Sequence, residues 1–442
     1  MSLSDRWKKQ TFWSLPVYTG DVSGVCSALY ELGGMVVMHD PSGCNSTYNT
    51  HDEVRWMDME SLIFLSGLKD IDAITGNDQK LIDDITDAAE KLHPKFIAIA
   101  NSPIPWLIGT DFRALCSKVF NKTGIPCFHI ETNAMHDYTI GAGDAFLELA
   151  KMLFPDMAAG IYKDTERQKD SRRGRLKVNI LGMTPLDFTV RSQIGSLRSL
   201  LEKAEFDVVS VWAIGDDLDT LSNASDADVN LVVSSTGLKT AQFFEERFGI
   251  PYAAGIPAGA FCGPLLKSLR RAASSGRSEV PYLDPGLRAR CPESRQETTS
   301  GSGYETEVPE SEADGQDYEK FSSAPAHHTS ARNEKARRCI VGEPVTMGSF
   351  AAAMAIRDGK SCDVICLTEL SSGLTGNGDR CPEGEEEIRR TLSDYDEVTG
   401  DPMLEKVCRY GTRFHRLAHL AYSGRVYLDE IPALITGKEN LG

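Results

Sequence analysis

The sequence predicts an α/β protein of three doubly wound, parallel-sheet (Rossmann-like) domains, the third reduced, with a disordered insertion. Short apolar runs alternate with amphipathic helical stripes, and Gly and Pro separate them. Such alternation is typical of a parallel sheet covered by helices. One long segment near residue 300 lacks apolar residues. We therefore expect a first domain at 1–175, a second at 176–272, the insertion at 273–335, and a partial third domain with a helical tail at 336–442.

The first expected domain begins with an apolar, strand-like run at 35–38. In the helix expected at 78–92, apolar residues share one stripe, and the His93-Pro94 pair stops the helix. The remaining elements follow as strand 96–100, helix 112–120, strand 127–130 and helix 144–153.

The second expected domain repeats this order. Gly182, Gly215 and Ser234 follow its strands, at the edge where doubly wound sheets bind ligands. Its elements are strand 178–181, helix 190–203, strand 208–212, helix 218–223, strand 230–233 and helix 238–248.

Residues 273–335 are rich in Ser, Glu, Gly, Arg and Pro, which predicts a solvated spacer or a segment that folds on binding. The third domain then needs a strand from 339, a helix at 347–356 and a strand at 363–367, followed by a helix at 403–422.

The composition bounds the classes of function. The 442 residues carry a net charge of -17, which argues against a nucleic-acid surface. No apolar run reaches about 18 residues, so we expect no membrane span. With no signal-peptide pattern, the expected location is cytoplasmic. The 11 cysteines then indicate thiols or metal ligands rather than disulfides.

Two phosphate-binding patterns are incomplete. A nucleotide-binding P-loop ending at Gly359 would need Gly at position 354, which is Met354. The glycines at 141 and 143 lack the third Gly of a dinucleotide fingerprint, because position 146 is Phe146. We expect no nucleotide hydrolysis by this chain, and a plain loop-to-helix turn at 141–143.

The other ligand-like pairs favour packing. His415 and His419 lie one turn apart on the expected tail helix, but the metalloprotease pattern needs Glu at 416, which is Arg416. We expect core or surface histidines. Cys362 and Cys366, like the cysteines at 116 and 127, are expected in the core.

Cys26 and Cys44 bracket the most informative stretch. An apolar run ends there in a turn, and Gly43 stands directly before the second cysteine. Thiolates with small neighbours, and with backbone N–H groups free to point at sulfur, are what an iron–sulfur cluster requires. The alternative is two buried structural cysteines, but Pro41 and Gly43 indicate a loop.

The turn His-Asp-Pro-Ser-Gly-Cys at 39–44 resembles the nitrogenase component 1 superfamily, in which it reads His-Gly-Pro-x-Gly-Cys. Cys26 matches the first cluster cysteine of that family. Similarity extends through residues 18–266 and, loosely, 338–367, and further familial segments lie at 70–76, 107–111, 227–233 and 248–252.

Two departures from the family limit the function. Pro103 stands where nitrogenase has its third cluster cysteine, and no cysteine lies near Ser234, where the iron–molybdenum cofactor would be held. The chain is therefore not expected to carry the dinitrogen-reducing cofactor in the usual way.

Two thiolates do not complete a cubane, which usually takes four. We expect a [4Fe–4S] cluster that Cys26 and Cys44 of two copies share in a homodimer. A heterodimer with a related component 1 subunit is the alternative, and Ser102, Asp40 or water are further ligand candidates.

The resemblance implies an iron–sulfur subunit of a nitrogenase-like reductase. It would accept electrons from a separate ATP-dependent iron–sulfur reductase and reduce a small-molecule or tetrapyrrole-like substrate. The alternatives are a scaffold for metallocluster or cofactor assembly and a redox-inert paralogue. His39 and His136 are the candidate proton donors, and Gly43, Ser102 and Ser234 the candidate cofactor contacts. We expect the substrate in a crevice between domains, beside residues such as Gly182, Thr184, Pro185, Ser234, Ser235 and Thr236.

Overall fold

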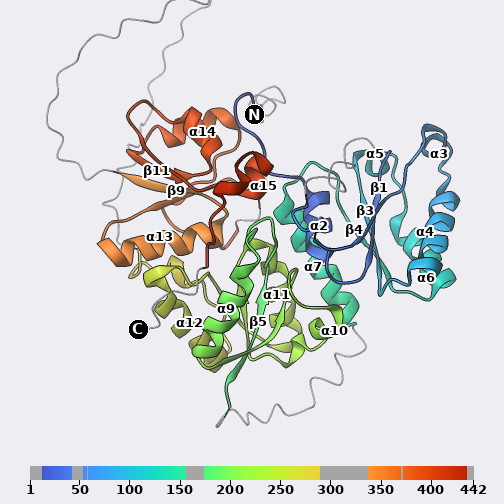
Figure 1. The fold of residues 1–442 in the computed structure, drawn as a ribbon, viewed down its shortest axis with the longest axis horizontal. Helices are drawn as coiled ribbons and strands as arrows, with labels where there is room; N and C mark the ends of the chain where they lie inside the picture. Colours follow the sequence, from blue (N-terminus) through green and yellow to red (C-terminus); the bar gives the residue numbers. More distant parts are fainter. Residues whose placement is uncertain are drawn as a thin grey trace, which may run out of the picture.

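The computed structural model describes residues 12–41, 53–56, 58–155, 174–288, 337–369 and 372–435. Within them the chain forms three four-stranded sheets, in each of which all strand pairs are parallel. Each sheet with its helices forms one lobe (Figure 1): the first lobe lies within residues 20–155, the second within 174–288 and the third within 337–435. The predicted α/β class is confirmed.

The first sheet has the order β2-β1-β3-β4 and two apolar faces. Alternate residues of β1 and β3 face opposite sides, so one set packs with α2 and α7 and the other with α4 and α6. The bounds are α2 Asp21–Leu29, β1 Met35–His39, β2 Leu62–Leu65, α3 Asp70–Thr75, α4 Asp78–Leu92, β3 Ile97–Asn101, α5 Pro103–Leu107, α6 Phe112–Thr123, β4 Cys127–Ile130 and α7 Tyr138–Leu153.

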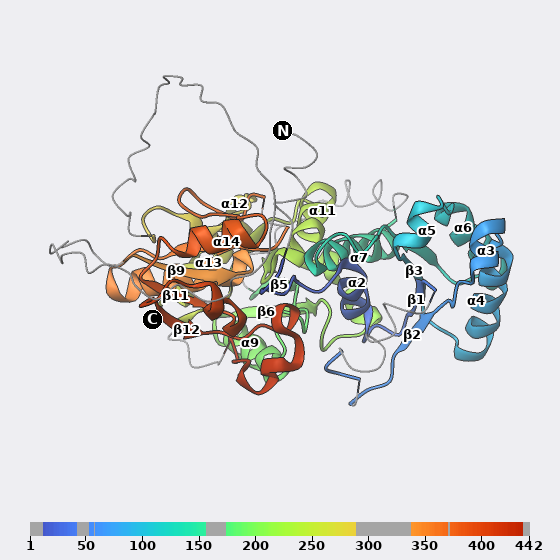
Figure 2. The same cartoon turned by 90° about the horizontal axis from the view of Figure 1, so that it is seen from above.

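Helix α7 begins earlier than the sequence predicts, and this corrects the expected turn at 141–143. Asp137 caps the helix by accepting a hydrogen bond from the Thr139 backbone N–H. Gly141 then lies inside α7, where a Cβ atom would come within 1.9 Å of the Asp21 carbonyl oxygen. The glycines therefore let α2 and α7 approach each other closely. Figure 2 shows this helix pair between the first sheet and the second lobe.

The second sheet has the order β6-β5-β7-β8. Helix α12 runs to Ser275, and Tyr282 beyond it is fully buried, so defined structure continues past the expected start of the insertion at 273. Residues 289–336 lie outside the described residues. The bounds are β5 Leu176–Leu181, α9 Ser192–Lys203, β6 Phe206–Val211, α10 Leu218–Leu221, β7 Val229–Val232, α11 Leu238–Phe248, β8 Tyr252–Ala254 and α12 Cys262–Ser275.

The third sheet, β10-β9-β11-β12, has as many described strands as each of the others, so it is not reduced. The expected tail helix at 403–422 is wrong. Gly411 adopts φ 89°, which breaks any helix there, and β12 then pairs with β11. The bounds are β9 Arg338–Gly342, α13 Pro344–Asp358, β10 Asp363–Cys366, α14 Glu385–Leu392, β11 Glu397–Gly400, β12 Arg413–Arg416 and α15 Leu420–Ser423.

Candidate functional site

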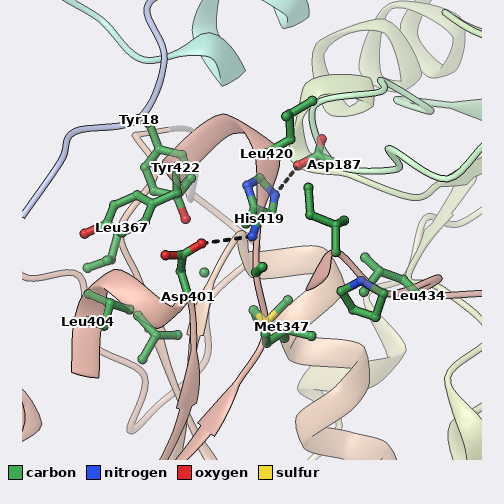
Figure 3. A pocket seen from close by; sticks show the side chains of 16 residues that line it. Tyr18, Asp187, Met347, Leu367, Asp401, Leu404, His419, Leu420, Tyr422 and Leu434 are labelled. Carbon is green, nitrogen blue, oxygen red and sulfur yellow. Dashed lines mark hydrogen bonds and ion pairs between the residues drawn. The ribbon is translucent and has the colours of Figure 1, made fainter. Parts of the chain in front are cut away.

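A small pocket lies where residues of the N-terminal segment, the second lobe and the third lobe meet (Figure 3). Tyr18 lines it from the N-terminal segment and Asp187 from the loop after β5, while the third lobe supplies most of the wall. The space enclosed is about 20 Å³, which is room for roughly one water molecule. The third-lobe walls include Met347, Leu367, Asp401, Leu404, His419 and Tyr422.

Asp187 is the centre of a buried hydrogen-bond network at this pocket. Its Oδ1 accepts a hydrogen bond from the Tyr138 hydroxyl (2.5 Å), and its Oδ2 accepts from the hydroxyls of Ser234 (2.7 Å) and Thr184 (3.0 Å). The carboxylate side chain has no exposed surface. Gly182 turns the chain directly after β5 with φ 89°, and this brings Thr184 and Asp187 back over the strand ends. Three hydroxyl donors compensate for the burial of one negative charge.

His419 faces Asp187 from the third lobe. Its backbone N–H donates to Asp401 Oδ2 (2.9 Å), and its ring Nε2 lies 3.3 Å from Asp187 Oδ1. The other ring nitrogen, Nδ1, is buried and has no hydrogen-bond partner among the residues that the structure describes. Buried polar atoms are rarely left unpaired, so this nitrogen is available to a ligand or a water molecule.

Aromatic rings close the pocket on the side of the N-terminal segment. The centroid of the Tyr18 ring lies 4.9 Å from that of the Tyr422 ring and 5.7 Å from that of the His419 ring. Burial raises the pKa of both Tyr18 and Tyr422 above the usual value for a phenol, and nearby acidic groups add to the shift. Both hydroxyls therefore stay protonated at neutral pH and can donate hydrogen bonds.

Glu343 ties the second and third lobes together next to this network. Its Oε1 accepts from the backbone N–H groups of Ser235 (2.8 Å) and Val345 (3.1 Å), and its Oε2 accepts from Thr346 N–H (2.8 Å). Burial, together with the nearby Asp187 carboxylate, raises the pKa of Glu343 to about 7. The residue caps α13 and also holds the Ser235 loop, which follows β7 in the second lobe.

A second polar group lies at the carboxyl edge of the first sheet. His39 ends β1, and its Nδ1 is 2.8 Å from the Ser66 hydroxyl. Burial lowers the pKa of His39 to about 4, so the ring is neutral at pH 7. Ser102 donates its N–H to the His39 carbonyl oxygen (3.2 Å), and the Ser102 hydroxyl is buried with no partner in the described part of the chain. Gly43 and Cys44, predicted at this edge, lie outside the described residues.

Cys26 lies within α2. It is fully buried in the apolar core of the first lobe, and burial raises the pKa of its thiol above the usual value, with a further contribution from the Glu53 carboxylate. No group of three or more His, Cys, Asp or Glu side chains that could hold a metal ion occurs among the described residues. Cluster ligation by Cys26 and Cys44 therefore stays a prediction.

A family model described as "Nitrogenase component 1 type Oxidoreductase" matches residues 24–266, which is more than half of the chain. The chain belongs to this family. In this component 1 type protein the matched region includes the first lobe from α2 onwards and the second lobe as far as α12.

The names of individual relatives of this component 1 type protein describe different roles. The chain is 27% identical to a nitrogenase iron-molybdenum cofactor biosynthesis protein NifE of Methanosarcina barkeri, over 49% of this chain and 46% of the relative. It is 28% identical to one of the subunits of a light-independent protochlorophyllide reductase of Prochlorococcus marinus, over 40% and 33%. The matched part thus spans less than half the length of each of these relatives.

A solved structure entitled "Nitrogenase Cp1 at pH 6.5" superposes with a TM-score of 0.56 and covers 92% of this chain and 87% of that chain. The sequence identity is 11%, so this likeness shows the fold alone. The described residues contain no helix long and apolar enough to cross a membrane.

The candidate site residues predicted from the sequence of this component 1 type protein lie at different places in the structure. Ser234 lies in the Asp187 network, whereas His39 and Ser102 lie at the edge of the first sheet. His136 is half exposed and pairs with Glu369 of the third lobe at 2.8 Å, and it is not among the residues that line the pocket.

The sequence pattern does not single out Asp187, and it favours a packing role for His419. It predicts His415 and His419 on one helix, but His415 lies on β12 and pairs with Glu397 (2.8 Å), whereas His419 follows that strand. Asp187 could have been found from its position, because an acidic residue shortly after a buried strand and a glycine turn lies at the ligand-binding edge of a parallel sheet.

Proposed function

We propose that the chain is the iron–sulfur subunit of a nitrogenase-like reductase. In this proposal it accepts electrons from an ATP-dependent iron–sulfur reductase and reduces a small molecule, or part of a tetrapyrrole-like substrate, at the pocket between Asp187 and His419. Family membership supports the reaction class. One observation favours this location: a buried imidazole with an unpartnered Nδ1 beside a fully buried carboxylate.

The pocket residues supply protons to a substrate that gains electrons. Asp187 accepts a hydrogen bond from Nε2–H of His419, which leaves Nδ1 facing the ligand. When the ring is protonated, Nδ1 carries a proton that it can donate, and the Asp187 carboxylate stabilises the resulting imidazolium. Tyr138, which donates to the same carboxylate, holds it in position.

A [4Fe–4S] cluster, when bound, would supply single electrons. We propose that Cys26 and Cys44 hold it, with the remaining ligands from a second copy or a related component 1 subunit. Gly43 and Ser102 would be contacts close to it, and His39 and His136 are the further candidate proton donors. The unpaired Ser102 hydroxyl is the described feature that favours a ligand at this edge.

Iron and sulfide analysis of protein purified without oxygen tests the cluster. We expect about four irons per dimer in the wild type, and a loss of most of them in Cys26→Ala and in Cys44→Ala. The matched control is Cys116→Ala, because Cys116 is also a buried cysteine on a helix of the first lobe. Equal iron in the wild type and Cys44→Ala would end the assignment.

A scaffold for cofactor assembly is the second candidate, and the named role of the M. barkeri relative favours it. The two candidates differ at His419. A scaffold would bind metal in the pocket in addition to the cluster, and His419→Gln would lose only that excess. In a reductase, His419→Gln would keep all of its iron and keep the electron paramagnetic resonance signal of the dithionite-reduced cluster.

A further inference from the structure

The N-terminal segment at residues 12–19, which we name the strap, runs over the surface from the third lobe to the first. Trp13 and Val17 are 88% and 60% exposed, whereas Leu15 between them is buried in the core of the third lobe. No helix or strand is assigned within residues 12–19. The strap is therefore held by a few identifiable contacts rather than by a sheet or a helix bundle.

Glu385, at the start of α14, holds one end of the strap. Its Oε2 accepts hydrogen bonds from three successive backbone N–H groups, those of Trp13 (2.7 Å), Ser14 (2.7 Å) and Leu15 (3.1 Å). Burial acts to raise the pKa of Glu385, but these three bonds and one from Arg389 bring it down to about 2. The carboxylate thus stays charged at any physiological pH, and so the attachment is insensitive to pH.

The other end of the strap is fixed beside the pocket. Thr19 N–H donates to the Ala421 carbonyl oxygen (2.7 Å), and the Thr19 carbonyl oxygen accepts from Tyr138 N–H (2.8 Å). Tyr18, which directly precedes Thr19, points its ring into the pocket wall against Tyr422 and His419 (Figure 3).

The pocket is too small to admit a ligand unless one of its walls moves. As it stands, the pocket leaves about 20 Å³ to a water-sized molecule, which is room for roughly one water. Any ligand larger than water requires a wall to move. Asp187 and His419 are fixed by buried networks, but Tyr18 belongs to a strap with no regular secondary structure. Tyr18 is a wall residue that lies outside the helices and strands and that a single segment carries across the pocket.

We propose that the strap closes the pocket, with Tyr18 filling the space beside His419 and Glu385 acting as the latch. When Trp13–Leu15 leave Glu385 and Leu15 leaves the core of the third lobe, Tyr18 swings out about the fixed Thr19. The vacated volume then admits the ligand. The inference rests on the proposed function only in taking this pocket as the ligand site. The covering of His419 by the strap is a property of the free protein.

Hydrogen exchange of the full-length chain tests the latch. In Glu385→Ala the backbone amides of Trp13, Ser14 and Leu15 should exchange at least about tenfold faster than in the wild type, because they lose their acceptor. The control is Glu386→Ala, which removes the same side chain from the next, exposed position of α14. Unchanged exchange in Glu385→Ala would overturn the latch.

Carbethoxylation of histidines by diethyl pyrocarbonate, quantified by peptide mass spectrometry, tests the closure. With exposed His93 as the internal reference, His419 should react several-fold faster in Glu385→Ala and in Tyr18→Ala than in the wild type and in Glu386→Ala. Fast exchange of the strap amides with an unchanged reaction rate at His419 would overturn the closure.

Glu385→Gln provides a milder variant, since it keeps one oxygen acceptor and should show an intermediate rate at His419. These measurements need no cluster and no substrate. A protein without iron that still shows the His419 effect would refute the proposed function and leave the strap closure standing.

Discussion

Asp187 Oδ1 and His419 Nε2 lie 3.3 Å apart across the boundary between the second and third lobes. The Asp187 carboxylate is also the acceptor for the Tyr138 hydroxyl of the first lobe. One buried anion thus connects side chains of all three lobes, and any movement between the lobes must change its hydrogen bonds.

Replacement of this anion by a neutral amide should destabilise the protein. In the wild type both carboxylate oxygens of Asp187 accept hydrogen bonds from hydroxyl groups. In Asp187→Asn an NH2 group replaces one of these oxygens, so at least one buried hydroxyl donor loses its acceptor. We expect a loss of about 1–3 kcal/mol in the free energy of unfolding, measured by urea denaturation. Asp207→Asn is the control because Asp207 is exposed, and it should change the value by less than about 0.5 kcal/mol. Equal values for the two variants would contradict the network.

Two glycine-to-alanine substitutions inside helices should change the stability of the protein in opposite directions. Gly141 lies at the close contact of α7 with α2, whereas Gly195 of α9 faces open space. Gly141→Ala places a Cβ atom 1.9 Å from the Asp21 carbonyl oxygen, so the helices must separate at a cost of about 1–3 kcal/mol or more. Gly195→Ala, inside α9 with no atom within 4 Å of the new Cβ, should stabilise by about 0.5–1 kcal/mol through better helix propensity. The thermal midpoints of the two variants should therefore shift in opposite directions.

His39 should make stability fall as the solution is acidified. Its folded-state pKa of about 4 lies below the ordinary value of about 6.5, so between these values the unfolded chain binds a proton that the folded protein excludes. The free energy of unfolding therefore rises with pH through this window and falls on acidification. We expect His39→Gln to lose less stability than the wild type between pH 7 and pH 5, by roughly 2 kcal/mol.

Denaturation at the two pH values measures this difference. His93→Asn, at an exposed position, should follow the wild-type pH dependence. If the free energy of unfolding of His39→Gln depends on pH as it does in the wild type, the His39 ring is not buried as a neutral group.

A buried ion-pair group joins the first and second lobes at Arg55. Its guanidinium donates to Glu53 (2.7 Å), to Glu31 (3.0 Å) and to the Ser27 carbonyl oxygen (2.8 Å), and Glu31 also accepts from Arg191 (2.7 Å). Arg55→Met leaves buried carboxylates without their partner, so we expect a loss of about 3–5 kcal/mol.

The matched control for Arg55 is an exposed pair between the same lobes. Lys95 bonds Asp219 at 2.9 Å and both side chains are exposed, by 42% and 81%, so Lys95→Met should cost about 0–1 kcal/mol. Chemical denaturation measures both variants. A comparable small loss for Arg55→Met would mean that the lobes are not held together by this group.

Much of the fold could be predicted because strand and helix periodicities are local properties. The helices at 78–92 and 238–248 and the strand at 127–130 have the predicted bounds. The helix start at Tyr138 was missed because Gly141 and Gly143 suggest a turn unless a second helix is known to need their small size. The tail was predicted as one helix because a strand such as β12, at an edge and largely exposed, has little apolar alternation.

The sequence by itself determined the α/β class, most of the strands and helices, and the resemblance of the cysteine turn at 39–44 to a family that the family model confirms. Only the tertiary structure brought Asp187, His419 and Tyr18 into one pocket. These residues are separated by well over 100 positions along the chain, and nothing in local periodicity encodes a contact between the ends of different sheets. Their proximity arises because lobes bury apolar surface against one another, and the polar groups caught at that junction must then find partners there.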